Sequence, residues 1–280
     1  MTSTTNEPDR RVTVAGVDIA VDDRGPGDVE TSGLPLVLVH GFTGGRVDFA
    51  DVIDELATER RVVAWDHRGH ADSTNTGNPA TYTFDQLADD MGGVLEELGI
   101  AAFHLLGHSM GGVVAQRYTL ANPAPVQSLI LMDTAGEAMG GIPPELIEAT
   151  VAKGRAKGMP AVAASMRRML EEAPLPEDSR ERILDRLVHK LANMDVEAFA
   201  ALGRALGEYP SMLERLGREV TVPVTVIVGA NDVGLRPAAE NLHHAIPKSE
   251  LVVIPDAAHS PQDENPSAWL AAVRAHLARA

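Results

Sequence analysis

The sequence of 280 residues contains no cysteine, and this absence excludes several kinds of chemistry. A chain without thiols forms no disulfides, thiolate zinc sites or iron–sulfur clusters, and it has no cysteine nucleophile. Long hydrophobic runs are also missing, because the longest one, around residues 35–39, falls far short of the roughly 18 residues of a spanning helix. The first ten residues are polar and lack the apolar stretch of a signal peptide. We therefore expect a soluble, cytoplasmic protein that does not enter a membrane.

Basic side chains are scarce as well. The chain has 24 Lys and Arg against 40 Asp and Glu, a formal net charge of −16 at pH 7. Such a balance argues against binding to the phosphates of nucleic acids or to anionic membrane surfaces. Hydrophobic residues make up 44% of the chain, which is enough for a sizeable core. Neither a nucleic acid nor a membrane is therefore expected as a partner, and the oligomeric state stays open.

Short apolar runs alternate with helical stretches along most of the chain. The segment 11–22 is expected to form two short strands around the turn at Ala15-Gly16. The runs that follow are apolar on both faces, which is typical of strands buried in a parallel sheet with helices on both sides. The further expected strands are 34–39, 61–65, 102–106, 128–132, 222–228 and 251–254, and the expected helices are 49–58, 84–98, 110–121, 237–245 and 266–278.

This alternation stops between about residues 136 and 212. The segment has no strand signal and instead predicts four successive helices, at 144–157, 160–172, 179–194 and 196–209. Because both flanks belong to the same sheet, we expect a helical lid inserted into one α/β domain. The predicted organisation is a flexible tail at 1–10, a core formed by 11–135 and 213–280, and a lid or cap at 136–212.

The clearest chemical signal is the segment Gly107-His108-Ser109-Met110-Gly111-Gly112. It follows an apolar run and precedes a helical stretch, which is the context of a strained strand-to-helix turn that exposes a nucleophilic serine. The start of the following helix lies beneath the hydroxyl, where backbone N–H groups and the helix dipole favour an oxyanion. Ser109 is therefore the predicted nucleophile.

A serine hydroxyl needs a general base, and His259 is the preferred candidate. It lies in the loop after the last predicted strand, and loops at the carboxyl ends of parallel strands converge on one crevice. His40 and His108 also lie beside strand ends and compete for this role. His40 belongs to a glycine-rich loop with another expected task, and His108 adjoins Ser109 on a tight turn where neighbouring side chains diverge.

The base in turn needs a carboxylate that fixes its tautomer. Asp232, in the segment Gly229-Ala-Asn-Asp, follows one predicted strand, and Asp133 follows another, so both are candidates. Asp232 is preferred because the chain order then reads Ser, Asp, His, the order that accompanies this type of nucleophile turn. Asp133 remains its rival.

A glycine-rich loop, His40-Gly41-Phe42-Thr43-Gly44-Gly45, follows the first buried strand. Its glycines allow an N–H to point toward Ser109, and we expect the backbone N–H groups of Phe42 and Met110 to form an oxyanion hole. The loop lacks the Lys and the spacing of a phosphate-binding loop. Asp66, His67 and His70 could look like metal ligands, but no further ligand group is apparent beside them, so no metal site is expected.

Taken together, these motifs resemble those of α/β-hydrolase fold proteins over residues 11–280. The matching segments are HGFTGG, DHRGHADS at 66–73, GHSMGG, GAND and AHSPQDENP, with Ala71 and Ala258 standing where the family often has Gly. The resemblance implies an α/β-hydrolase fold, a mostly parallel doubly wound sheet with a helical lid, and loop-stabilising contacts around Asp66. Ser109 argues against the dehalogenases and epoxide hydrolases of the family, which use an Asp nucleophile.

The expected activity is hydrolysis of a small-molecule carboxylic ester or lactone through an acyl-enzyme on Ser109, without metal or cofactor. The stretch from Ser109 through LILMDTAG resembles enol-lactonases and small esterases. Two alternatives stay open. A C–C bond hydrolase acting on a β-diketone-like product uses the same triad, and some members of the fold are non-catalytic ligand-binding proteins.

Overall fold

The computed structural model describes residues 7–26, 33–139, 142–171, 177 and 179–280. Its centre is an eight-stranded sheet in the order β1-β2-β4-β3-β5-β6-β7-β8. The pairs β1/β2 and β2/β4 are antiparallel and all other pairs are parallel. The strands are β1 (Arg10–Val14), β2 (Val17–Arg24), β3 (Leu36–Val39), β4 (Val62–Trp65), β5 (Phe103–His108), β6 (Val126–Met132), β7 (Val224–Gly229) and β8 (Glu250–Ile254).

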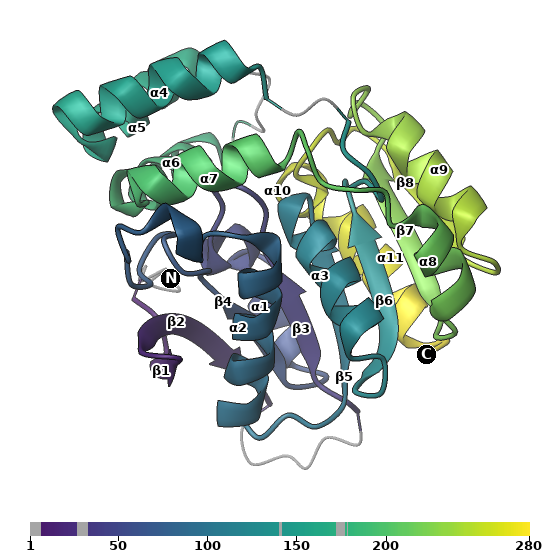
Figure 1. Ribbon diagram of the computed structural model, residues 1–280. Helices are drawn as coiled ribbons and strands as arrows, with labels where there is room; N and C mark the ends of the chain where they lie inside the picture. Colours follow the sequence, from purple (N-terminus) through teal and green to yellow (C-terminus); the bar gives the residue numbers. More distant parts are fainter. Residues whose placement is uncertain (1–6, 27–32, 140–141, 172–176, 178) are drawn as a thin grey trace.

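Helices cover both faces of this sheet, and the alternation of the strand residues explains why (Figure 1). Val37 and Val39 of β3 belong to one hydrophobic core, which includes α2 (Phe84–Glu97) and α3 (Met110–Ala121). Leu36 and Leu38 belong to a second core. That core contains α1 (Ile53–Ala57) and α11 (Pro266–Leu277), while α8 (Leu213–Glu219) and α9 (Arg236–Ala245) join the first. Successive strand residues face opposite sides, so strands apolar at every position require two covered faces.

Five described helices lie between β6 and β7 in the chain, and the first four of them gather at one end of the sheet (Figure 1). They are α4 (Pro144–Lys157), α5 (Met159–Leu170), α6 (Arg180–Asn193) and α7 (Val196–Ala205). Apolar residues of these helices, Ile147, Phe199 and Leu202 among them, belong to the first core. The four helices therefore pack directly on the α/β part of the chain. No helix among the described residues is both long and apolar enough to cross a membrane.

The structure confirms the predicted fold class and shortens several expected elements. The expectation of one helix over 49–58 is wrong, because a 3₁₀ turn (Arg46–Phe49) and the short α1 occupy this part of the chain. The expected helix 196–209 ends four residues early, at Ala205. Helix α8 and the short α10 (Pro261–Glu264) were not anticipated. Short helices hold too few apolar positions to show a helical period.

The segment 1–10, expected to be a flexible tail, is partly built into the sheet. Residues 1–6 lie outside the described part of the chain. Arg10 begins β1, and the Asp9 carboxylate accepts a hydrogen bond of 3.0 Å from the N–H of Asp23. The hairpin between β1 and β2 turns at Ala15 and Gly16, which both have positive φ angles, of 49° and 78°. Such a turn suits the twist of a two-stranded hairpin.

Candidate active site

Ser109 stands between β5 and α3 with φ 54° and ψ −120°. A positive φ is strained for a residue with a Cβ and persists only where the surrounding structure enforces it. The enforcement comes from close packing, because a Cβ added at Gly111 would lie 2.3 Å from the carbonyl oxygen of Val39. Glycine lets α3 start directly against the end of β3, and this contact holds Ser109 at the end of the sheet.

The loop after β3 reaches the same point. A Cβ added at Gly41 would lie 2.9 Å from the Cβ of Ser109, so the loop backbone is in contact with the serine. Phe42 follows Gly41, and both residues line the same cavity as Ser109. Met110 is the first residue of α3, so its N–H has no acceptor within the helix. The two backbone groups expected to form the oxyanion hole therefore flank the serine.

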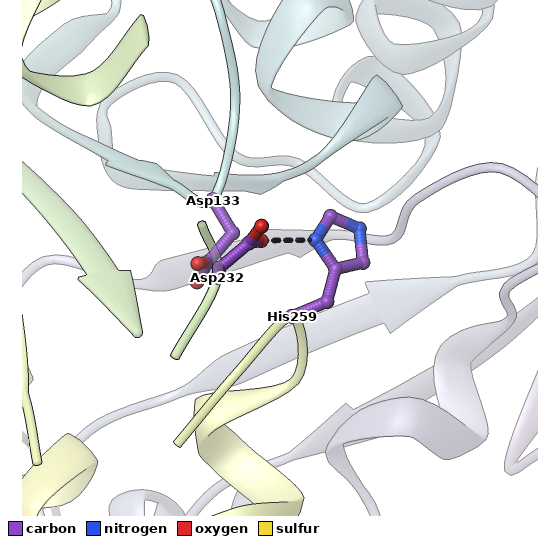
Figure 2. Close-up of side chains that lie close together, drawn as sticks. All are labelled: Asp133, Asp232 and His259. Carbon is purple, nitrogen blue, oxygen red and sulfur yellow. Dashed lines mark hydrogen bonds and ion pairs between the residues drawn. The ribbon is translucent and has the colours of Figure 1, made fainter. Parts of the chain in front are cut away.

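His259 lies between Ser109 and Asp232. Its Nε2 is 3.1 Å from the Ser109 Oγ, and its Nδ1 is 2.7 Å from an Asp232 oxygen, a bond drawn as a dashed line in Figure 2. The three side chains come from three loops, after β5, β7 and β8. Half of the His259 side chain, 49%, is exposed, so it is open to the cavity above the sheet. The structure thus brings together the three residues that the sequence selected.

The rival carboxylate, Asp133, is adjacent to the same group. It follows β6, is fully buried, and lies beside Asp232 in Figure 2. One oxygen each of Asp133 and Asp232 and a ring nitrogen of His259 lie within 4.8 Å of one another. Asp133 Oδ1 accepts a hydrogen bond of 2.9 Å from the N–H of Gly229, whereas its Oδ2 is buried and receives no donor.

Electrostatics separate the roles of these two carboxyl groups. Burial, together with the neighbouring charge of Asp232, raises the pKa of Asp133 to about 9. Burial also acts to raise the pKa of Asp232, but the hydrogen bond and charge of His259 outweigh it, and the pKa lies below its usual value. Asp133 is therefore protonated at neutral pH, which makes its Oδ2 a donor beside an ionised Asp232.

His40 and His108, the competing bases, are occupied elsewhere. The His40 Nε2 accepts the N–H of His67 at 2.9 Å, and its Nδ1 donates to the Gly41 carbonyl at 2.8 Å. His108 donates from Nε2 to the carbonyl oxygen of His259 at 2.6 Å. Burial lowers the pKa of His40 well below its usual value and that of His108 to about 4, so both rings are neutral.

The loop that carries His259 is held at two points. His108 bonds its carbonyl, as described, and the Glu264 carboxylate of α10 accepts the N–H of Ala258. From the sequence, His108 is a candidate only for the role of base, and Glu264 has no predicted role. The His108 contact depends on how the end of β5 meets the loop after β8, 151 positions further along the chain, so no local sequence signal could have revealed it. Glu264 lies only six positions from Ala258, within the segment after β8.

The cavity in front of Ser109 has a volume of about 410 Å³. His259 lines it, and the apolar side chains Leu184 and Leu187 of α6 lie across from the serine. Four charged side chains also line it, namely Asp48, Lys190, Asp263 and Glu264. Lys190 of α6 forms an ion pair with Asp48 of the 3₁₀ turn after β3. No pattern in the sequence indicates that this lysine lines the same cavity as the nucleophile.

The group of Asp133, Asp232 and His259 is also the place where the described residues could hold a metal ion. However, the proton on Asp133 and the hydrogen bond that engages the Nδ1 of His259 leave this group poorly suited to a cation. Asp66 instead holds its loop together, because its carboxylate accepts the N–H groups of Arg46 at 2.7 Å and Asp72 at 3.1 Å.

Comparison with known proteins supports the assignment of the fold. A family model described as alpha/beta hydrolase fold matches residues 35–266. A Bacillus subtilis protein provisionally named 2-succinyl-6-hydroxy-2,4-cyclohexadiene-1-carboxylate synthase is 27% identical over 259 residues, 90% of this chain and 91% of the relative. The chain therefore belongs to the α/β hydrolase fold family.

Two solved structures are similar along nearly the whole chain. A thermophilic esterase from Thermogutta terrifontis, with malate bound, has a TM-score of 0.78 and 29% identity, covering 96% of this chain and 98% of the esterase. An enol-lactonase from Burkholderia xenovorans LB400 has a TM-score of 0.80 and 24% identity, covering 96% of this chain and 100% of the lactonase. The second likeness concerns the fold alone.

Proposed function

We propose that the protein hydrolyses carboxylic esters or lactones of small molecules through an acyl-enzyme on Ser109. The observation that carries this proposal is the position of His259, 3.1 Å from the Ser109 Oγ and 2.7 Å from Asp232. Nucleophile, base and orienting carboxylate in hydrogen-bond contact are the minimum for acyl transfer by a serine. Membership of the hydrolase family and the similarity to an esterase support the same reaction class.

In the proposed reaction, His259 takes the Ser109 proton while Oγ attacks the ester carbonyl. The carbonyl oxygen becomes negative and is stabilised by the N–H groups of Phe42 and Met110. His259 then protonates the leaving alcohol, and a water molecule, deprotonated by His259, releases the acid. Asp232 stays ionised throughout and stabilises the imidazolium. The reaction as drawn needs no metal or cofactor.

Helices α4 to α7 are proposed to act as a lid over this chemistry. Leu184 and Leu187 of α6 line the Ser109 cavity, so α6 limits the space available to a bound substrate. A lid that forms one wall of the cavity also excludes water from the acyl-enzyme and selects substrates by shape. The proposed lid corresponds to residues 136–212, and the remainder of 11–280 to the catalytic core.

The reaction is tested with a fluorophosphonate probe, which phosphonylates activated serines, and with p-nitrophenyl acetate. We expect one adduct, mapped by mass spectrometry to Ser109, and ester turnover that Ser109→Ala reduces by several orders of magnitude. Ser211→Ala, a serine outside the cavity, is the matched control and should leave turnover unchanged.

Absence of both the adduct and turnover in the folded wild-type protein would refute the esterase proposal. A C–C bond hydrolase or a ligand-binding protein would then have to be tested instead. An adduct on another serine would refute the assignment of Ser109.

A further inference from the structure

Ser109 lines a second, apolar cavity in addition to the one that contains His259. It has a volume of about 230 Å³ and is lined by Ser109 itself, Met110 and Val113 of α3, and Leu206. Asp133 also lines it, but this side chain is fully buried and its charge is suppressed by protonation. An apolar group attached to the Ser109 Oγ therefore has a compatible space directly beside it.

A third hollow lies between α4, α5 and α7. Its volume is about 420 Å³, and its walls include Ile142, Val162, Met166 and Phe199. Two of its polar side chains, Lys153 and Ser165, are hydrogen-bonded to each other, which reduces the cost of apolar contact. We call this hollow the α4–α5 groove.

Shared residues connect the groove to the nucleophile. Ile142 lines both the α4–α5 groove and the apolar cavity beside Ser109. Phe42 and Thr43 line both the groove and the cavity that contains His259. Phe42 also carries the N–H proposed for the oxyanion hole. The groove therefore adjoins both cavities that contain Ser109.

Exposed apolar side chains gather at the same place. Met139, Leu146 and Met169 have 46%, 55% and 72% of their surface exposed, and each lines either the apolar cavity or the groove. Large exposed apolar side chains grouped at a hollow mark a surface that binds an apolar partner. Since the group surrounds the groove that reaches Ser109, we assign it to the substrate.

The position of His259 decides which part of an ester enters the groove. His259 must protonate the leaving alcohol, so the alcohol lies in the cavity that His259 lines. Asp48, Lys190, Asp263 and Glu264 line that same cavity beside Leu184 and Leu187, and these ionisable groups suit a polar alcohol better than an aliphatic chain, which would take water from them. Neither the apolar cavity nor the groove contains His259. The acyl part is left to occupy them.

We propose, on the basis of the esterase function above, that the substrate is an ester of a medium- or long-chain aliphatic acid. Its chain runs from Ser109 through the apolar cavity into the α4–α5 groove, while a polar alcohol faces His259 and Lys190. The class of partner is thus an acyl ester with an apolar tail and a polar leaving group.

The test is a series of p-nitrophenyl esters, from acetate through butyrate and octanoate to decanoate, below their critical micelle concentrations. Each added methylene should raise kcat/KM by about threefold until the groove is filled, because burial of a CH₂ contributes a roughly constant free energy. The kcat/KM of each longer ester is compared with that of acetate.

Ala149→Phe is the variant that examines the groove. Ala149 is exposed on α4 and lines the groove, so a phenyl ring there fills the space without disturbing the core. We expect about tenfold lower kcat/KM for decanoate, from loss of about two buried methylenes, and an unchanged value for acetate. Ala152→Phe, also exposed on α4 but outside the groove, is the matched control and should change neither.

The outcomes separate this proposal from the esterase function. Turnover that is flat or falls with chain length, or an Ala149→Phe variant that affects acetate and decanoate equally, would overturn the aliphatic-acyl proposal and leave the esterase intact. No adduct on Ser109 and no turnover of any ester would overturn the esterase function and this proposal with it.

Discussion

At the scale of single residues, two carboxyl groups lie near His259 and differ in protonation. Asp232 is bonded to the His259 Nδ1 at 2.7 Å, and Asp133 has a buried oxygen without a donor. If Asp133 were ionised, this oxygen would be an unsatisfied charge in the interior, which is costly. A proton on Asp133 removes the cost and provides a hydrogen bond to Asp232. The difference between their pKa values thus follows from burial and contact.

Asparagine substitutions distinguish these roles. Asp133→Asn should retain kcat within a fewfold of wild type, because the amide resembles a protonated carboxyl: its oxygen accepts the Gly229 N–H and its NH₂ donates to Asp232. Asp133→Ala lacks that donor, so the pKa of Asp232 should rise and kcat should fall further than in Asp133→Asn. The charge of Glu264 also acts to raise the pKa of Asp133, and Glu264 is unchanged in both variants.

Asp232→Asn should instead lower kcat by about four orders of magnitude, because the amide favours the wrong tautomer of His259. The four proteins are compared by steady-state kinetics across pH, with circular dichroism to verify folding. A silent Asp232→Asn together with an inactive Asp133→Asn would show that Asp133 is the carboxylate that orients His259.

At the scale of an element, the loop after β3 shows how a short segment serves the proposed chemistry. It supplies Phe42 to the expected oxyanion hole and contacts Ser109 through Gly41. Its conformation is supported by the Gly44 N–H, which donates to the Gly41 carbonyl at 3.0 Å, and by the Asp48 carboxylate, which accepts the Gly45 N–H at 3.0 Å. The loop is therefore fixed by its own backbone and by the 3₁₀ turn that follows.

Gly41→Ala should reduce kcat by about 10²-fold while changing thermal stability little. The new Cβ would lie 2.9 Å from the Ser109 Cβ, so the loop must move and the Phe42 N–H loses its alignment with the oxyanion. Gly25→Ala is the matched control, because its Cβ would meet only ordinary contacts at 3.8 Å. Steady-state kinetics measure kcat of both variants, and thermal melts measure their stability. Full activity of Gly41→Ala would mean that Phe42 does not contribute a donor.

At the scale of the whole molecule, buried histidines make the free energy of unfolding depend on pH. Burial lowers the pKa values of six of them: His70, His104 and His108 to about 4, His276 to about 3, and His40 and His67 well below their usual range. The unfolded chain protonates these groups near pH 6.5 while the folded protein does not, so acidification favours unfolding.

Buried acids act in the opposite direction. Burial raises the pKa values of Asp66 and Asp263 to about 7 and of Asp133 to about 9. The folded protein keeps these protons between pH 4 and 7 whereas the unfolded chain releases them, so each one makes the protein more stable as pH falls. Below about pH 6.5, where most of the histidines of the unfolded chain are protonated, six histidines outweigh three acids, and over the span from pH 7 to 5 the histidine effect prevails.

The free energy of unfolding should therefore decrease as pH falls from 7 to 5, by about 1.4 kcal/mol per pH unit for each histidine not offset by an acid. Urea denaturation at a series of pH values measures it. His276→Asn removes one of the six groups and should reduce the slope by about one proton equivalent, even if it lowers stability overall. A free energy of unfolding that is constant or rises between pH 7 and 5 would contradict this account.

The sequence by itself determined the fold class and the three candidate residues of the site. Apolar runs on both strand faces required a covered parallel sheet, and the glycines around Ser109 permitted only a tight strand-to-helix turn. Both signals are local, because they lie within a few consecutive residues. Asp232 and His259 were selected from their positions after predicted strands, and the structure brings them within hydrogen-bond distance of one another and of Ser109. Their catalytic roles remain predictions.

Only the tertiary structure decided which side chains surround that group. Lys190 of α6 reaches Asp48 across 142 positions of sequence, and His108 bonds the carbonyl of His259 across 151 positions. The link between the α4–α5 groove and Ser109 depends likewise on how α4 and α5 pack over the loop after β3. Contacts of this kind leave no periodic pattern in the chain, because they depend on the packing of separate elements rather than on the order of neighbouring residues.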